Sequence, residues 1–148
     1  MIPARRNASQ FPPRGVQLNN PGLIRIGPDT WTGQSNSQGD SEFVTFVTVA
    51  YGVRAMFRLL DAYSRIHQVD STRDIINRWA PPSENVTSNY VDFVVSRTML
   101  PADHRWIKGA DLLSRSFHRV PLVEAIAIYE NGWRLESSEI LEGLRALS

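Results

Sequence analysis

The sequence predicts a mainly α-helical domain with a small β-hairpin, and three observations lead to this fold class. Apolar residues recur every three or four positions over residues 49–66, the spacing of a long amphipathic helix. Shorter segments with the same spacing follow, separated by helix-stopping residues such as Pro81-Pro82. Two short runs, residues 23–26 and 43–48, have the composition of strands. A length of 148 residues, 42% of them hydrophobic, suffices for one domain with a core.

The first part of the chain is expected to hold the irregular segments and the hairpin. Residues 1–21 contain four prolines among polar residues without periodicity, so we expect an irregular N-terminal arm and a folded domain over residues 22–148. A turn at 27–30 and a polar loop at 35–40 separate the two strand candidates. These strands are expected to pair as the hairpin.

The helices that follow are delimited by capping and stop signals. Ser71 with Asp74 three residues later indicates the start of a short helix that Pro81-Pro82 must end. Ser83 is expected to cap a further helix reaching residue 97. Three more helices are predicted near residues 109–117, over 122–131 and from residue 137.

Glu130 is the candidate catalytic acid. Val123, Ile126, Ala127 and Glu130 share one helical stripe, and Gly132 can end that helix in the left-handed conformation. A carboxyl group at the edge of an apolar face has its pKa raised by burial, which suits a general acid near neutral pH. On spacing alone, a helix-terminal glutamate pointing to water is the competing interpretation.

Composition and motif spacing exclude several classes of function. A net charge of +1, with 16 basic and 15 acidic residues interspersed, gives no electrostatic footprint for nucleic acid. The absence of cysteine excludes disulfides and thiolate chemistry. The N-terminus leads into polar residues, so neither a signal peptide nor membrane insertion is expected. No metal-binding spacing of histidines, serine-hydrolase elbow or phosphate-binding glycine loop is present, so we expect no metal and no cofactor.

Three clusters of aromatic and polar residues indicate a sugar-binding cleft. A pyranose offers an apolar face for stacking and a rim of hydroxyl groups for hydrogen bonding. We therefore predict substrate contacts from Asn19, Asn20, Arg25, Trp31, Gln34, Trp79, Glu84, Asn85, Tyr90 and Tyr129, with Trp79 mostly buried beside the cleft. The competing interpretations are core packing for each tryptophan and a simple turn for the Asn-Asn-Pro-Gly run.

Three other carboxylates, those of Glu84, Asp40 and Glu42, are alternatives to Glu130 or possible partners for it. Glu84 follows Pro-Pro in the first turn of a predicted helix, where the helix dipole lowers the pKa of an acid, so an orienting role fits it better than proton donation. Paired-carboxylate hydrolysis requires a second acid, for which Asp40 and Glu42 near the hairpin are the candidates.

Several of these segments resemble a group of bacteriophage and prophage virion proteins, some of which are thought to cleave peptidoglycan as members of the lysozyme superfamily. The most specific is Arg-Trp-Ala-Pro-Pro-x-Glu-Asn-x-Thr-x-x-Tyr, which spans residues 78–90. Gln-Leu-Asn-Asn-Pro-Gly-Leu-Ile-Arg at 17–25 and Trp-Thr-Gly-Gln at 31–34 belong to the same resemblance. Leu23 stands where the group usually has asparagine, and Tyr129 where histidine is common.

A second resemblance, to the soluble lytic transglycosylases, implies a mechanism. Residues 125–132, Ala-Ile-Ala-Ile-Tyr-Glu-Asn-Gly, are similar to the helix that carries the catalytic glutamate of that family. Residues 22–25, 49–66 and 78–90 are similar to its later segments, in rotated order. The resemblance implies a circularly permuted, lysozyme-like domain with the hairpin beside the cleft. It also implies that Glu130 lies across a groove from residues 22–34, with Tyr90 and residues 79–85 at one side.

These resemblances imply a peptidoglycan-degrading lytic enzyme of a bacteriophage, either a lytic transglycosylase or a muramidase. Its partners would be the glycan strands of peptidoglycan and other virion proteins, and it would act in the virion or after delivery to the host periplasm. The alternative is a virion structural or glycan-binding protein that keeps the fold without turnover.

Overall fold

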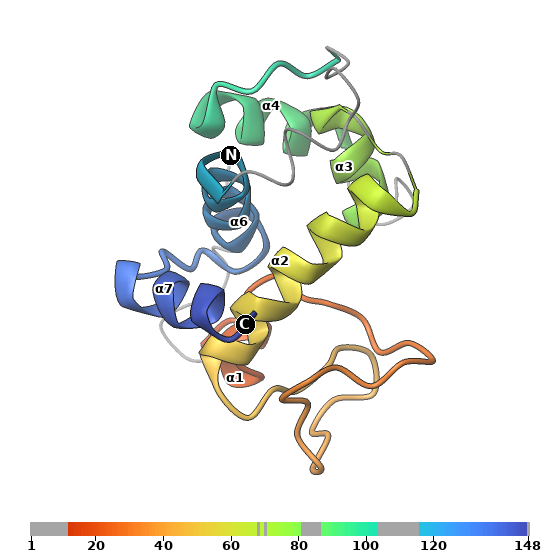
Figure 1. Cartoon of the computed structure of the whole chain (residues 1–148), viewed down its shortest axis with the longest axis vertical. Helices are drawn as coiled ribbons and strands as arrows, with labels where there is room; N and C mark the ends of the chain where they lie inside the picture. The colour runs from red at the N-terminus through yellow and green to blue at the C-terminus, as the bar shows by residue number, and fades with distance from the viewer. Residues whose placement is uncertain (1–11, 68, 70, 81–86, 104–115, 148) are drawn as a thin grey trace. The chain divides into compact units, whose positions relative to one another are not determined.

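Helices account for nearly all regular secondary structure in the computed structural model, which describes residues 12–67, 69, 71–80, 87–103 and 116–147 (Figure 1). The chain divides into two compact units. The middle unit comprises Leu59–Ala125, and the two-segment unit combines Ile2–Arg58 with Ile126–Ser148. The mainly α fold class is confirmed, whereas the lysozyme-like architecture stays a prediction.

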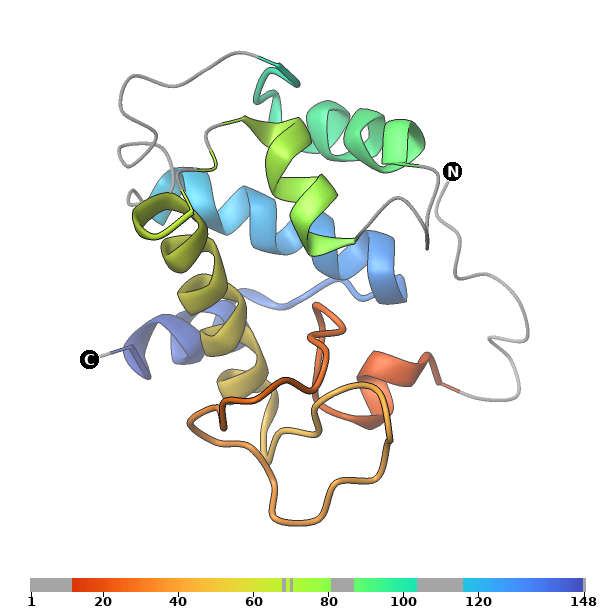
Figure 2. The same ribbon diagram turned by 90° about the vertical axis from the view of Figure 1, so that its right-hand side faces the viewer.

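The middle unit contains the end of α2 (Val49–Arg65), then α3 (Thr72–Trp79), α4 (Thr87–Thr98) and the start of α6 (Ser116–Asn131). The helix predicted from residue 49 ends within a residue of its expected boundary. The cap predicted at Ser71 is confirmed, because its hydroxyl oxygen accepts a hydrogen bond from the Asp74 amide at 3.1 Å. Helix α3 packs against α4 (Figure 1, Figure 2), and both bury apolar side chains, namely Ile75, Ile76, Val91 and Val94.

Two expected helix segments lie partly or wholly outside the described residues. The helix predicted to begin at Ser83 is seen from Thr87, since residues 81–86 are not described. The helix predicted near residues 109–117 also falls outside the description, apart from its last two residues, which belong to α6.

The two-segment unit contains α1 (Arg14–Gln17), the first turns of α2, the end of α6, and α7 (Ser137–Arg145). Helix α7 packs closely on α2, because a Cβ atom added at Gly143 would collide with the Val53 side chain. The Arg54 and Arg58 guanidinium groups on α2 donate to the carbonyl oxygens of Ala146 and Leu147, both at 3.0 Å. The end of α7 is thereby fixed to α2.

The structure differs from the predicted irregular arm over residues 12–21. Pro13 precedes the short helix α1, and Gly15, Leu18 and Asn20 are buried in the two-segment unit. The sequence did not predict that this segment packs into the core. Residues 1–11 lie outside the described residues.

The predicted hairpin is reduced, in the described part of the chain, to two isolated antiparallel bridges, Arg25 with Phe43 and Gln34 with Phe46. Two backbone hydrogen bonds join the two predicted strands, from the Ile26 amide to the Glu42 carbonyl oxygen at 3.0 Å and from the Val44 amide to the Ile24 carbonyl oxygen at 2.9 Å. The Gln38 amide group accepts from the Thr45 amide at 2.9 Å and donates to the Thr45 carbonyl oxygen at 3.0 Å. The two predicted strands therefore meet at one point without extending into a sheet.

Candidate active site

Glu130 lies in the last turn of α6, at the end of a buried helix face. Ile126 and Ala127, its neighbours one turn earlier, have no exposed surface, while Glu130 itself is half-buried. Gly132 has a φ of +63°, and its amide donates to the Ile128 carbonyl oxygen at 2.7 Å. The predicted glycine-terminated helix end is confirmed, and it holds the carboxylate at the boundary between core and solvent.

Tyr129 precedes the candidate acid and is buried, with 6% of its surface exposed. Burial raises the pKa of its phenol, and the negative charge of Glu130 raises it further. The hydroxyl group therefore stays protonated at neutral pH. A buried ring offers little surface to a sugar, so direct stacking on Tyr129, as predicted, does not fit its position.

Asn131 fixes the end of α6 to the N-terminal part of the chain. Its Oδ1 atom accepts from the Gly15 amide at 2.9 Å, and its Nδ2 atom donates to the Pro21 carbonyl oxygen at 2.8 Å. The side chain is 2% exposed, and a Cβ atom at Gly15 would collide with it. The residue beside Glu130 thus joins the end of α6 to the Asn-Asn-Pro-Gly segment, whereas the groove between Glu130 and residues 22–34 stays a prediction.

The two asparagines of that segment have structural roles. Asn20 is completely buried, and its amide group bonds the Ile24 amide at 2.9 Å and the Ile24 and Val44 carbonyl oxygens at 3.0 and 2.8 Å. Asn19 adopts a left-handed φ of 55° and donates to the Phe46 carbonyl oxygen at 3.0 Å. The predicted sugar contact of Asn20 is wrong for this conformation, because its polar atoms already bond buried backbone groups.

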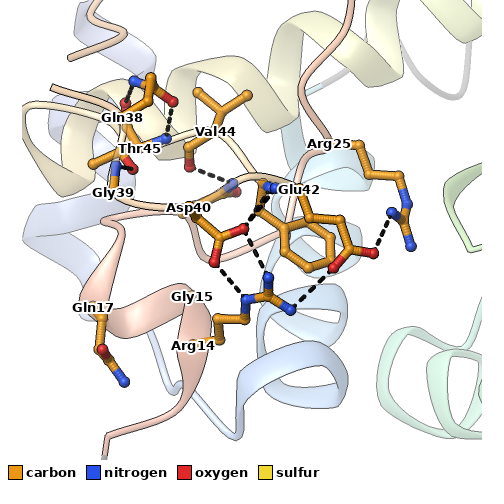
Figure 3. A network of polar contacts seen from close by, with 12 residues as sticks. Arg14, Gly15, Gln17, Arg25, Gln38, Gly39, Asp40, Glu42, Val44 and Thr45 are labelled. Carbon is orange, nitrogen blue, oxygen red and sulfur yellow. Dashed lines mark hydrogen bonds and ion pairs between the residues drawn. The ribbon is translucent and has the colours of Figure 1, made fainter. Parts of the chain in front are cut away.

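Figure 3 shows a charged network that joins α1 to the loop before Phe43. Arg14 binds Asp40 through two nitrogens, at 2.6 and 2.8 Å, and Glu42 at 3.1 Å. Arg25 binds the other oxygen of Glu42 at 2.8 Å. The two guanidinium groups lie 4.6 and 4.9 Å from the centre of the Phe43 ring. The predicted sugar-binding residue Arg25 is exposed but engaged in this network.

The network decides the protonation of both candidate second acids. Hydrogen bonding to Arg14 lowers the pKa of Asp40 far below its ordinary value. The backbone amides of Phe43 and Glu42 lower this pKa further, because they donate hydrogen bonds to the Oδ1 atom of Asp40 at 2.9 and 2.8 Å. Arg25 and then the positive charge of Arg14 lower the pKa of Glu42. Neither carboxylate is a proton donor near neutral pH.

The Arg14–Asp40 pair predicts an acid-dependent loss of stability. Because the Asp40 pKa is lower in the folded chain than in the unfolded one, its contribution is present above about pH 4 and is lost as the pH falls. We expect thermal midpoints, measured by circular dichroism, to be lower for Arg14→Gln than for the parent at pH 6. The two should converge towards pH 2.

The matched control is Arg65→Gln, which removes an exposed pair with Asp61 inside α2. Exposed pairs one helical turn apart contribute little to stability, so this variant should follow the parent at every pH. A constant difference between Arg14→Gln and the parent from pH 6 to pH 2 would contradict the assignment.

Trp31 and Gln34 are half-buried in the loop that faces Phe46. The Gln34 side-chain oxygen accepts from the Trp31 amide at 3.1 Å, and the Gln34 amide donates to the Trp31 carbonyl oxygen at 3.0 Å. Gly33 between them has a φ of +82°, and a Cβ atom there would collide with Tyr51. The loop is therefore held from inside, and a sugar contact of its partly exposed side chains stays a prediction.

The remaining predicted site residues belong to the middle unit. Tyr90 has no exposed surface, so it is a core residue and its predicted sugar contact is wrong for this conformation. Trp79 is half-buried, in line with the prediction that most of its surface is covered, and its ring lies edge-on to Tyr63 at a centroid distance of 6.1 Å. Glu84 and Asn85 lie outside the described residues.

Sequence reasoning missed Arg14, Gly15 and Asn131. The sequence analysis gave Asn131 no role of its own, although an amide beside a helix-ending glycine is well placed to bond a neighbouring backbone. Arg14 and Gly15 were assigned to the irregular arm. The available signal was the pattern Pro-Pro-Arg-Gly, in which proline precedes the first turn of a helix.

Within the described ranges, neither a metal site nor a membrane-spanning helix is found. No group of three or more histidine, aspartate or glutamate side chains there converges to hold a metal ion. In the same residues, no helix is both long and apolar enough to cross a bilayer.

The chain is similar to Protein P5 of Pseudoalteromonas phage PM2, with 36% identity over 108 residues. The matched region covers 71% of this chain and 66% of that protein, just under two thirds of its length. No family model matches the chain. The similarity supports a bacteriophage context for the chain.

Proposed function

We propose that the chain is a bacteriophage lytic enzyme that cleaves peptidoglycan between N-acetylmuramic acid and N-acetylglucosamine. The observation that carries the proposal is the position of Glu130, half-buried after Ile126 and Ala127 and next to the anchored Asn131. A glutamate in such a position is partly desolvated yet accessible, which is what a general acid requires. The similarity to a phage protein supports a setting in the virion, and action in the host periplasm is a further part of the proposal.

A mechanism with one acid fits the charges of the two-segment unit best. Glu130 would donate its proton to the glycosidic oxygen as the bond from that oxygen to the muramyl C1 breaks. The resulting carboxylate would then take the proton of the muramyl 6-hydroxyl group as its oxygen bonds to C1, which closes an anhydro ring and restores the acid. Asp40 and Glu42, both bound to arginines, support this single-acid route over paired-carboxylate hydrolysis.

A non-catalytic virion structural or glycan-binding protein is the second candidate function. The observation in its favour is that Asn20 and Tyr90, two of the predicted sugar ligands, are buried and unavailable to a glycan. The same motif residues would then serve folding alone. The predicted sugar ligands that keep exposed surface, and so remain candidates under either function, are Asn19, Arg25, Trp31, Gln34 and Trp79.

Mass spectrometry of muropeptides after incubation with purified peptidoglycan separates these possibilities. Anhydro-muropeptides are the expected product, and they identify a transglycosylase. New reducing ends would identify a muramidase, in which water replaces the 6-hydroxyl group. A sacculus unchanged after prolonged incubation would reject both enzymes in favour of the non-catalytic function.

A further inference from the structure

Four side chains of the middle unit form an aromatic and cationic cluster, which we call the Arg78 cluster: Tyr63, His67, Arg78 and Trp79. The buried Tyr63 ring lies edge-on to Trp79 and to His67, with centroid distances of 6.1 and 6.4 Å. Tyr63 comes from α2, His67 follows that helix, and Arg78 and Trp79 end α3. The cluster therefore lies where these two helix ends meet.

Arg78 is exposed but held in place by rings. Its guanidinium carbon lies 5.6 Å from the centre of the Tyr63 ring, and Nη2 lies 3.0 Å from Nδ1 and 3.1 Å from Nε2 of His67. No carboxylate of the described residues is within ion-pair distance of it. Other arginines are neutralised by acidic partners, namely Arg14, Arg25, Arg65 and Arg73. Arg78 is thus an oriented positive charge that the described residues leave uncompensated.

This chemistry suits a ligand that combines a carboxylate with a sugar. A guanidinium group binds a carboxylate through two parallel hydrogen bonds, and its prior orientation on aromatic rings reduces the entropy lost on binding. The indole of Trp79, the next residue, is half-buried, and its exposed part offers an apolar surface for a pyranose ring. The exposed imidazole of His67 adds a hydrogen-bonding group beside the cation.

The geometry points to the Arg78 cluster as a binding site for the muramoyl peptides of peptidoglycan, with Arg78 on a stem-peptide carboxylate and Trp79 against the sugar. The choice of peptidoglycan rests on the proposed function. The site itself contains no residue of the proposed catalytic machinery. A nucleic acid is the less favoured ligand, because a net charge of +1 gives the chain no overall electrostatic attraction for a polyanion.

Calorimetric titration of the whole chain tests the site with two soluble probes. N-acetylmuramoyl-L-alanyl-D-isoglutamine carries a carboxylate, whereas triacetylchitotriose is a neutral sugar. Arg78→Gln should weaken binding of the first probe by about ten-fold or more, since a lost charge-assisted hydrogen bond changes affinity by at least this factor. Its binding of the neutral probe should not change. Arg78→Lys, which keeps the charge but not the planar fork, should fall between Arg78→Gln and the parent.

Arg97→Gln is the matched control, because Arg97 is also exposed on the middle unit, with its guanidinium carbon 5.5 Å from the Phe93 ring centre. It should bind both probes as the parent does. The inference is overturned if Arg78→Gln and Arg97→Gln behave alike, if the parent does not bind the carboxylate probe, or if Arg78→Gln weakens binding of a short DNA strand equally.

The binding test of the Arg78 cluster and the muropeptide test of the proposed function can fail independently of each other. Binding that depends on Arg78, together with unchanged sacculi, would reject the enzyme and keep the binding site. Anhydro-muropeptide release by an Arg78→Gln variant that binds the carboxylate probe normally would keep the enzyme and reject the site.

Discussion

Glu130→Gln is expected to reduce clearing of a cell-wall suspension by at least about 100-fold, the usual contribution of general acid–base catalysis. The substitution removes the transferable proton but keeps the shape of the side chain. Because Glu130 is only half-buried, the thermal midpoint should stay within about 3 °C of the parent value. Turbidity measurements and thermal unfolding followed by circular dichroism check the two parts separately.

Glu124→Gln is the control for this experiment, since Glu124 is an exposed glutamate on the same helix, α6. It should clear the suspension at the parent rate. If Glu130→Gln also does so, Glu130 is not the catalytic acid and the proposed mechanism fails. If Glu130→Gln is inactive but melts far below the parent, the carboxylate has a structural role instead.

Asn131→Ala is expected to destabilise the chain by about 2–5 kcal/mol. The change leaves the Gly15 amide and the Pro21 carbonyl oxygen without the bonds they make to the Asn131 side chain, and each unsatisfied buried group costs about 1–3 kcal/mol. In a chain of this size, such a loss lowers the thermal midpoint by roughly 4–20 °C. Circular dichroism on heating measures it directly.

Asn131→Asp refines the test because it keeps the acceptor for Gly15 but loses the donor to Pro21. A buried carboxylate facing a carbonyl oxygen has a raised pKa, so this variant should be least stable near neutral pH and recover partly in acid. Asn89→Ala, at an exposed position on α4, serves as the control and should melt close to the parent. An Asn131→Ala midpoint equal to that of Asn89→Ala would contradict the anchoring role.

The helices could be predicted from the sequence because their signals are local. The spacing of Val53, Phe57 and Leu60 specifies the buried face of α2, and these three residues have no exposed surface. The Ser71 cap and the Gly132 terminus depend on backbone groups within a few residues. The position of Glu130 at the end of a buried face follows from the same periodicity.

The remainder depends on contacts that no local pattern contains. Helix α1 has only four residues, too few to be stable alone, and Asn131 holds it from 116 positions away in sequence. Asn20 has the composition of a turn residue, and only the fold reveals that its amide group bonds Ile24 and Val44. A polar residue beside a turn reads the same in sequence whether it faces a ligand or the backbone. For this reason the sequence could not show that Asn20 bonds the backbone rather than a sugar.

The division of one unit between both ends of the chain determines an order of assembly during synthesis. The middle unit is continuous in sequence, so all of its residues are synthesised before residues 126–147. The two-segment unit must wait, because Gly15 needs Asn131 and Arg54 needs Ala146, partners 116 and 92 positions later. Contacts between such distant residues close slowly. The helix end that carries Glu130 is therefore completed last, so the proposed acid is positioned only when synthesis of the described chain is nearly finished.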